Sequence, residues 1–533
     1  MDLVASTPRD IPTPAADKLD WIGVTPRELA GFLAMVFGMF MAILDIQIVS
    51  ASLAQIQAGL SASAEEISWV QTSYLIAEVV MIPLSGFLSR LMSTRILFVT
   101  SAASFTLMSF FCATATSIEQ MIVFRALQGF LGGAMIPTVM AGSYIMFGRG
   151  RAAGVSVFVG LIATLAPTVG PTVGGILTSA FSWHWLFLIN LPIGIMITFI
   201  VWAIVDVDKP DWSLLDGIDI LGFSLMATFL GSLEYVLEEG SRKDWFEDGN
   251  IRTFAFIGAA AGIAFFARVL SARNPIVNLR VFKDRNFTLG AMFGMVLGVG
   301  LYGIVYLLPV YLARVRGYSS MQIGELVFVT GLFQFMSAPL AGTLSRFGYA
   351  RVVMMIGMSL MALSCFQFTY LTAEWGFWEM LIPQMLRGAG LMFCMIPANV
   401  IALSRLDPIT LKDATGLFNL LRNLGGALGL AILNTQLIER SAFHYQRLAE
   451  RVSAGRATAE GWIGGLTDRY NTLIPVDPQG AAIKTVTGFV HREALVLAFV
   501  DCFLILAIIY AVALLFTPLL SAPANMDQIQ VNE

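Results

Sequence analysis

Charged residues are scarce in this chain. Only 13% of its 533 residues are Asp, Glu, Lys or Arg, whereas soluble proteins carry about 25%. The formal net charge is -4 and there is no basic tail, so the charge pattern does not indicate a nucleic-acid partner. Cysteine is rare as well. Cys112, Cys365, Cys394 and Cys502 lie in apolar runs without CxxC spacing and are interpreted as small core residues, not as disulfide partners or metal ligands.

The sequence also lacks the motifs of common enzyme classes. No GxSxG, HExxH or GxxxxGK[ST] pattern occurs in a usable context, so we expect neither hydrolytic chemistry nor ATP-driven work. We expect no bound cofactor and no metal. Residues 1–27 are polar and mixed in charge, which is not the pattern of a cleavable signal peptide.

Long apolar runs occupy most of the remaining sequence. Hydrophobic residues make up 57% of the chain, and its mean hydropathy is +0.76. Because an apolar run of roughly 18 residues or more can cross a bilayer as a helix, the sequence predicts an all-α integral membrane protein. We place fourteen spans at about 29–52, 67–88, 95–114, 118–147, 153–179, 185–205, 216–236, 252–271, 287–313, 321–345, 351–372, 377–403, 412–436 and 494–518.

The positions of Lys and Arg predict the orientation of these spans. With the N-terminus in the cytoplasm, the inside connections hold most of the basic residues, as the positive-inside rule requires. The short outside connections hold only Arg242, Lys243, Arg252, Arg314 and Arg316. Both termini are therefore predicted to be cytoplasmic.

An internal repeat divides the chain into two halves. Pro83–Arg90 returns as Pro339–Arg346, and Leu127–Gly129 returns as Leu386–Gly388. Duplicated halves are typical of secondary transporters, in which the binding site lies near the membrane midplane where the halves meet. The predicted organisation is a cytoplasmic segment at 1–27, a six-helix half at 28–205, an inserted two-helix pair with a cytoplasmic linker at 206–286, a six-helix half at 287–518 and a cytoplasmic tail at 519–533.

One connection in the second half, at about 437–493, is unusually long and lies outside the membrane. Its pattern of apolar and charged positions is weak. It is long enough for a small helical structure. We interpret it as a solvated loop in the periplasm, and contact with a partner is the alternative.

The uncharged segment Val159–Leu177 is rich in glycine and proline. In water these residues cost a helix roughly 1 and 3 kcal/mol relative to Ala, but unsatisfied backbone groups are so costly in lipid that the helix stays wound. We expect a kinked, smooth helix that neighbours approach closely and that acts as a pivot between the halves. A helix that only packs tightly is the alternative. The residues concerned are Gly160, Pro167, Gly170, Pro171, Gly174 and Gly175.

Three ionisable residues within the spans are the main candidates for function. A charge inside the membrane costs a few kcal/mol or more and is a functional hypothesis by default. Asp45 and Arg125 lie at similar depths, so they could pair across a central cavity, and Glu78 lies near the middle of its span. Burial favours a protonated carboxyl and a nearby arginine favours an ionised one, so such a carboxylate can bind and release a proton. A structural role in holding the spans together is the alternative for each.

Other polar residues in the spans are secondary candidates. We interpret Glu234, in the inserted pair, as a peripheral group near the outer surface. In the second half, a role in the cavity or in structural pairing is considered for Arg387, Asn399, Asn419, Arg422 and Asp501.

Several segments resemble motifs of one known family. Gly170–Gly175 resembles the antiporter motif on the fifth helix of major facilitator exporters, and further similar segments are Leu44–Val49 in span 1, Phe124–Gly129 in span 4, Trp183–Gly194 at the start of span 6, Asn274–Phe287 and Asn419–Gly426. Over nearly its whole length the chain resembles the fourteen-span drug:proton antiporters of the major facilitator superfamily, and among them the EmrB-type multidrug efflux pumps.

The sequence departs from that family at three positions. In the inner loop after span 2, Arg90 and Ser93 stand in place of the usual acidic residue and glycine, which removes the acid of the conventional charge-relay latch. Glu78 stands where a neutral polar side chain is usual. It would favour cationic substrates or add a protonation site.

The resemblance implies a secondary active transporter and not an enzyme. It implies efflux of hydrophobic or amphipathic drugs and toxic compounds by alternating access across the bacterial inner membrane, driven by the proton gradient, with Arg125 linked to proton transfer. It also implies a tripartite assembly with an EmrA-like periplasmic adaptor and a TolC-like outer-membrane channel. The alternatives are a dedicated exporter of one metabolite (a siderophore, fatty acid or antibiotic), an importer by symport, and a membrane-embedded enzyme or scaffold.

Overall fold

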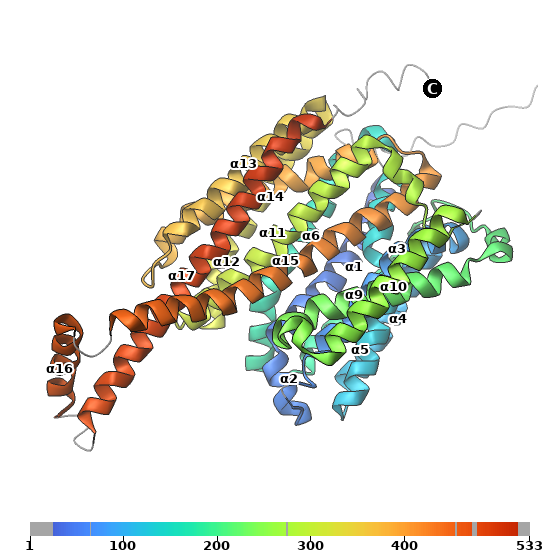
Figure 1. Cartoon of the computed structure of the whole chain (residues 1–533). Coiled ribbons are helices and arrows are strands. Elements are labelled where there is room, and N and C mark those ends of the chain that lie inside the picture. Colours follow the sequence, from blue (N-terminus) through green and yellow to red (C-terminus); the bar gives the residue numbers. More distant parts are fainter. Residues whose placement is uncertain (1–24, 64, 273–274, 453–455, 472–476, 521–533) are drawn as a thin grey trace, which may run out of the picture.

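The fold is a bundle of long helices (Figure 1). The computed structural model describes residues 25–63, 65–272, 275–452, 456–471 and 477–520, and over these residues it contains no strand. Thirteen segments are long and apolar enough to cross a membrane, and one of them, Met321–Tyr370, contains two helices. The described residues therefore hold fourteen crossings, which confirms the predicted all-α membrane fold.

The first half contributes six crossings. They are formed by α1 (Pro26–Ala51), α3 (Trp69–Met92), α4 (Thr94–Ala113), α5 (Ile118–Gly132) with the beginning of α6 (Met135–Ala180), the remainder of α6, and α8 (Asn190–Ile204); the short helices α2 (Leu53–Leu60) and α7 (Trp185–Leu188) lie between them. Helix α6 is broken at Gly148, where φ is 67°. Glycine adopts this left-handed conformation without a steric penalty because it has no Cβ atom, so two crossings can follow each other there.

The second half repeats this arrangement. Its crossings are α11 (Arg285–Arg314), α12 (Ser320–Leu344), α13 (Ala350–Gln367), α14 (Phe377–Leu403), α15 (Pro408–Arg451) and α17 (Pro478–Phe516). A π-helical turn, η5 (Ser345–Tyr349), joins α12 to α13, and Gly348 with a φ of 88° breaks the helix there. The two halves meet where α6 packs against α12 and where α3 packs against α15.

The inserted pair lies along one of these two seams. Helix α9 (Ile220–Glu239) packs against both α3 and α15, and α10 (Gly249–Ser271) packs against the other side of α9 (green in Figure 1). Two short 3-10 turns, η2 (Gly240–Arg242) and η3 (Trp245–Glu247), connect the two helices. Helix α9 therefore contacts both halves of the bundle.

The described part of the long connection at 437–493 is helical, which its length allowed. Helix α15 continues to Arg451, α16 (Ala457–Asn471) follows, and α17 begins at Pro478, so that a helical hairpin projects from the bundle (Figure 1). Trp462 packs on Phe489 with ring centroids 5.6 Å apart, and Tyr470 is hydrogen-bonded to Thr485. The hydropathy pattern of this hairpin is weak, because a helix outside the membrane needs only a narrow apolar stripe.

The glycine-rich part of α6 packs closely against α1. A Cβ atom on Gly170 would lie 2.4 Å from Cβ of Gln47, and one on Gly174 would lie 2.8 Å from the carbonyl oxygen of Ile48. Gly160 faces Ile396 of α14. The remaining residues of the predicted motif, Pro167, Pro171 and Gly175, lie on the same helix, and both prolines border cavities between the halves.

We predict that Gly174→Val destabilises the protein, because the added side chain has no space against α1 and overpacking of this kind costs about 1–3 kcal/mol. The measurement is the thermal unfolding midpoint of the detergent-solubilised chain. Gly461→Val in α16 is the matched control, since a Cβ atom there meets nothing within 4 Å. Equal midpoints for the two variants would show that the α1–α6 contact is not tight.

Candidate functional site

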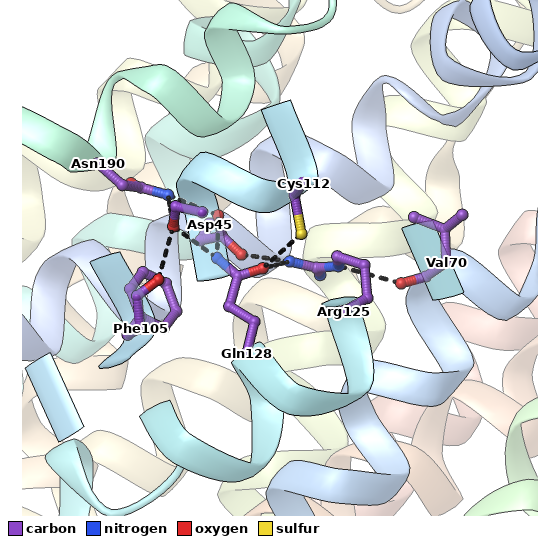
Figure 2. Close-up of polar contacts among 8 residues, drawn as sticks. Asp45, Val70, Phe105, Cys112, Arg125, Gln128 and Asn190 are labelled. Atoms are coloured by element: carbon purple, nitrogen blue, oxygen red, sulfur yellow. Dashed lines mark hydrogen bonds and ion pairs between the residues drawn. The ribbon is translucent and has the colours of Figure 1, made fainter. Parts of the chain in front are cut away.

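The most deeply buried polar network lies inside the first half (Figure 2). Arg125 Nη1 of α5 donates a hydrogen bond to Asp45 Oδ2 of α1 at 2.5 Å, and both side chains are fully buried. Asn190 Nδ2 of α8 donates to the other oxygen of Asp45 at 2.7 Å. Gln128 accepts from Arg125 at 2.8 Å and donates to Ser109 of α4 at 2.8 Å. The network thus joins four helices through one ion pair.

Aromatic rings and a backbone carbonyl complete the surroundings of the guanidinium group. Arg125 lies 4.2 Å from the ring centroid of Tyr74 and 5.9 Å from that of Phe187. Its Nε donates to the carbonyl of Val70 at 3.1 Å. The negative faces of aromatic rings attract a cation, so these contacts stabilise the position of the guanidinium group beside Asp45.

The structure therefore brings Asp45 and Arg125 together, but it does not place the pair across a central cavity. Neither residue lines the main cavity, and both are enclosed within the first half. Their spacing along the sequence showed only that they lie at similar depth. The rotation of α1 and α5 about their axes, which the sequence does not report, directs both side chains inward.

The corresponding place in the second half lacks an acid. Arg387 of α14 is buried and donates to Thr330 Oγ1 at 2.8 Å. Its Nη1, and both polar atoms of the neighbouring buried side chains Gln334 and Gln384, have no hydrogen-bond partner among the described residues. The buried arginine of the first half is thus paired with a carboxylate, whereas that of the second half is hydrogen-bonded to a hydroxyl group.

The other predicted residues of the second half lie in different surroundings. Asn419 donates to Met140 Sδ at 2.8 Å, and the carbonyl of Asn399 accepts from Tyr144 at 3.3 Å, so both contact the first half. Arg422 is buried, and its charge acts on Glu78. Asp501 Oδ2 accepts a hydrogen bond from His444 Nε2 at 2.8 Å, and the residue lies away from the main cavity.

The main cavity, of about 330 Å³, lies between the two halves and is closed on one side by α9. Glu78 is on its wall, together with Gln71 of α3, Tyr302 and Tyr306 of α11, and Glu234 of α9. The interpretation of Glu234 as a peripheral surface group is wrong, because only 5% of its surface is exposed and it borders this cavity. Drug-sized ligands bind in cavities of roughly 300–1,000 Å³, so the space suits a small organic molecule.

Ion pairs close the bundle at one end. Arg90 at the end of α3 pairs with Asp413 at the beginning of α15, which joins the two halves. Beside it, Lys412 pairs with Asp208 and donates to the carbonyl of Ser89 at 3.0 Å. We call this the latch end and the opposite end, which carries α16, the hairpin end. The cavity is lined by the first turns of α3 and by α15 beyond Asn423, so it lies toward the hairpin end.

Two of the departures from the family pattern lie at the latch end of α3. Arg90 replaces an acidic residue, and its partner Asp413 lies on the other half of the chain. Ser93 replaces a glycine and has a φ of 77°, a region in which non-glycine residues are strained by about 1–3 kcal/mol. Its hydroxyl accepts a hydrogen bond from the backbone of Ile96 at 3.3 Å and so caps α4.

Sequence reasoning missed several residues of this region. Asp413 and Asp208 were not among the predicted site residues. Glu238 was placed beyond the end of its span, although its i+4 spacing from Glu234 was a usable signal. Tyr302 and Tyr306 carry no local signal, because tyrosine is common in apolar spans.

Two packed halves, a closed end and an internal cavity define a multi-pass membrane transporter. The chain matches the model of the Major Facilitator Superfamily over residues 35–430, and it belongs to that family. The fold is similar to that of the human organic anion transporter MFSD10 (TETRAN), with a TM-score of 0.57 and 12% identity, covering 91% of this chain and 100% of that chain.

Proteins of similar sequence carry names that refer to resistance and export. The chain is 40% identical over 504 residues to the colistin resistance protein EmrB of Acinetobacter baumannii, covering 93% of this chain and 97% of that protein. It is 30% identical to the fatty acid resistance protein FarB of Neisseria gonorrhoeae and 27% identical to the multidrug export protein EmrB of Escherichia coli; each match covers 80% of this chain and 84% of the relative.

We predict that the Asp45–Arg125 pair behaves as one unit in stability measurements. Asp45→Asn and Arg125→Gln each leave one buried charge without its partner, which costs about 3–5 kcal/mol. The double variant leaves no unpaired charge, so its thermal unfolding midpoint should lie above those of both single variants. If the two losses simply add, the pair is not coupled as the geometry requires.

We also predict that the latch controls access to the latch end. Asp413→Arg places like charges together, so a cysteine introduced at Ser89, which is buried in the structure, should react several times faster with a maleimide, an effect typical of a shift of 1–3 kcal/mol between two states. The swap Arg90→Asp with Asp413→Arg should restore slow labelling. The four native cysteines are buried and report the background. Equal labelling in all variants would rule out a latch.

Proposed function

We propose that the protein exports hydrophobic or amphipathic toxic compounds by alternating access, driven by the proton gradient. The observation that carries this proposal is the cavity between the halves, which is sealed by ion pairs at the latch end and has the carboxylate of Glu78 on its wall. Rocking of the halves would break the latch and close the hairpin end, so the cavity would alternate between the two sides of the membrane.

Two acidic sites support coupling to protons. Glu78 is buried, and the charges of Arg125 and Arg422 attract it while that of Asp45 repels it. A carboxylate in such surroundings can change protonation when the cavity opens to the other side. Asp45 is held by Arg125 inside the first half and would respond to changes in the packing of α1 and α5.

The names of the relatives support efflux of drugs. Most of the cavity wall is apolar, with side chains such as Leu75 and Val305, which suits lipophilic compounds. The alternative is a dedicated exporter of one metabolite, and the name of the relative FarB keeps a fatty acid in consideration. The carboxylates on the cavity wall disfavour a fatty acid as that metabolite, because a fatty acid anion would meet like charges.

The proposal includes the location and partners of the protein. The chain would lie in the bacterial inner membrane with its termini and latch end in the cytoplasm, as the distribution of Lys and Arg indicates. The hairpin formed by α15, α16 and α17 would then stand in the periplasm, where it offers a surface for an EmrA-like adaptor that leads to a TolC-like channel. Exposed apolar residues on it, such as Trp462, suit such a contact.

The test is dye efflux from energised inverted vesicles, with proton movement followed by a pH probe. Asp45→Asn and Glu78→Gln are each expected to lower drug-induced proton movement to about a tenth of the wild-type rate or less, a factor that corresponds to about 1.4 kcal/mol. Glu247→Gln, at an exposed position of η3, is the control with the same change of charge.

Two results would contradict the proposal. If both variants move protons and dye as the wild type does, neither carboxylate couples transport. If the wild type moves none of the dyes, export of a single metabolite becomes the leading function.

A further inference from the structure

Helix α9 of the inserted pair is anchored to both halves of the transporter. Glu239 accepts a hydrogen bond from Thr72 of α3 at 3.1 Å. On the other side, Asn434 of α15 donates to Ser241 at 2.8 Å, and Trp245 donates to Thr435 at 2.9 Å. The end of α9 therefore bridges the seam between α3 and α15 toward the hairpin end, where the cavity lies.

The two long faces of α9 carry different chemistry. Tyr235 stacks on Trp69 with ring centroids 5.5 Å apart, and with Glu239 it forms the face that contacts α3. Glu234 and Glu238 are spaced i, i+4 and so share another face, and both line the cavity. Carboxylates of a membrane helix are expected to face a cavity because exposure to lipid is costly. The orientation of α9 satisfies that requirement.

The carboxylates on the cavity wall make no direct polar contact with another described side chain. Among the residues that the structure describes, Glu78, Glu234 and Glu238 form no hydrogen bond or ion pair. The charges of Glu78 and Glu238 both act on Glu234. The charges of Arg125 and Arg422 act on Glu78, and that of Arg242 acts on Glu238, but Arg125 is paired with Asp45 and Arg242 with Glu239. The acidic groups outnumber the basic ones, so the cavity attracts cations.

Two further features of the cavity point to a bound ligand. Gln71 is 91% buried and lines the cavity, and its Oε1 has no hydrogen-bond partner among the described residues. A buried acceptor of this kind is costly unless a ligand or water satisfies it. Tyr302 and Tyr306 of α11 also line the cavity, and aromatic rings bind quaternary ammonium groups well.

We propose that α9 is a wall of the substrate site, and that Glu234 and Glu238 act with Glu78 to select lipophilic cations carrying more than one positive charge. Apart from Arg422, the arginines near the three carboxylates are paired with Asp45 and Glu239, so the site keeps a net negative charge that one monovalent cation does not balance. The apolar side chains and the two tyrosines hold the hydrophobic body of the same ligand. The inserted pair thus takes part in substrate recognition, in addition to packing along the seam between the halves.

This inference rests on the proposed export function, and binding to the purified full-length chain in lipid nanodiscs tests it. Three fluorescence-monitored probes are compared: the bis-quaternary cation dequalinium, the monovalent cation tetraphenylphosphonium and the uncharged dye Nile red. The variants are Glu234→Gln, Glu238→Gln and their combination, with Glu234→Asp and Glu238→Asp as variants that keep the charge. The control is the exposed Glu247→Gln.

We expect each glutamine variant to weaken dequalinium binding about tenfold and the double variant about 100-fold, because each substitution removes one charge pair between the protein and the ligand. Tetraphenylphosphonium should lose roughly threefold, and Nile red should bind as to the wild type. The aspartate variants should retain the preference for dequalinium.

Two outcomes overturn the inference. Unchanged dequalinium binding in the double variant would show that α9 does not recognise charge, and an equal loss of all three probes would show that it has only a structural role. Export by wild-type vesicles separates this inference from the proposed function. If wild-type vesicles export Nile red and the glutamine variants keep full dequalinium affinity, only the inference fails. If wild-type vesicles export none of the three probes, the proposed function fails as well.

Discussion

A charge that is enclosed in a bundle of apolar helices must be compensated where it lies, because water cannot reach it. The ion pair between Asp45 and Arg125 meets this requirement, and the hydrogen bonds of Gln128 and Asn190 satisfy the remaining atoms of the carboxylate. Because these residues come from α1, α5 and α8, the requirement also fixes how these helices are rotated against one another. These contacts therefore connect helices of the first half to one another.

Charges elsewhere in the structure follow the same rule. Arg90, Lys412, Asp208 and Asp413 compensate one another across the halves at the latch end. Among the described residues, Glu78, Glu234 and Glu238 have no such direct partners, and they lie on the wall of the cavity. The compensated charges connect helices to one another, and the uncompensated ones face the cavity.

Much of the fold could be predicted from the sequence, but less of the site. The apolar runs identified the crossings because hydropathy is a local property, and Pro83–Arg90 with its repeat Pro339–Arg346 revealed the two halves. Asp45 and Arg125 were recognised as candidates, but their enclosure within one half was not. Glu234 was misplaced at the surface, because counting residues along α9 gives depth in the membrane and not direction. A small helical structure was allowed for the connection at 437–493, but its amphipathic pattern is too faint to place the helices.

The sequence by itself determined that the chain is a membrane protein of fourteen apolar helices, with two related six-helix halves and an inserted pair, and with a glycine-rich helix that neighbours approach closely. These properties depend on composition and on spacing within single helices. Only the tertiary structure decided that Arg90 meets Asp413, 323 positions further along the chain, and that Glu78, Glu234 and Glu238 border one cavity. Such contacts depend on how each helix is rotated about its axis, and this rotation is set by the packing of segments that are distant in the sequence.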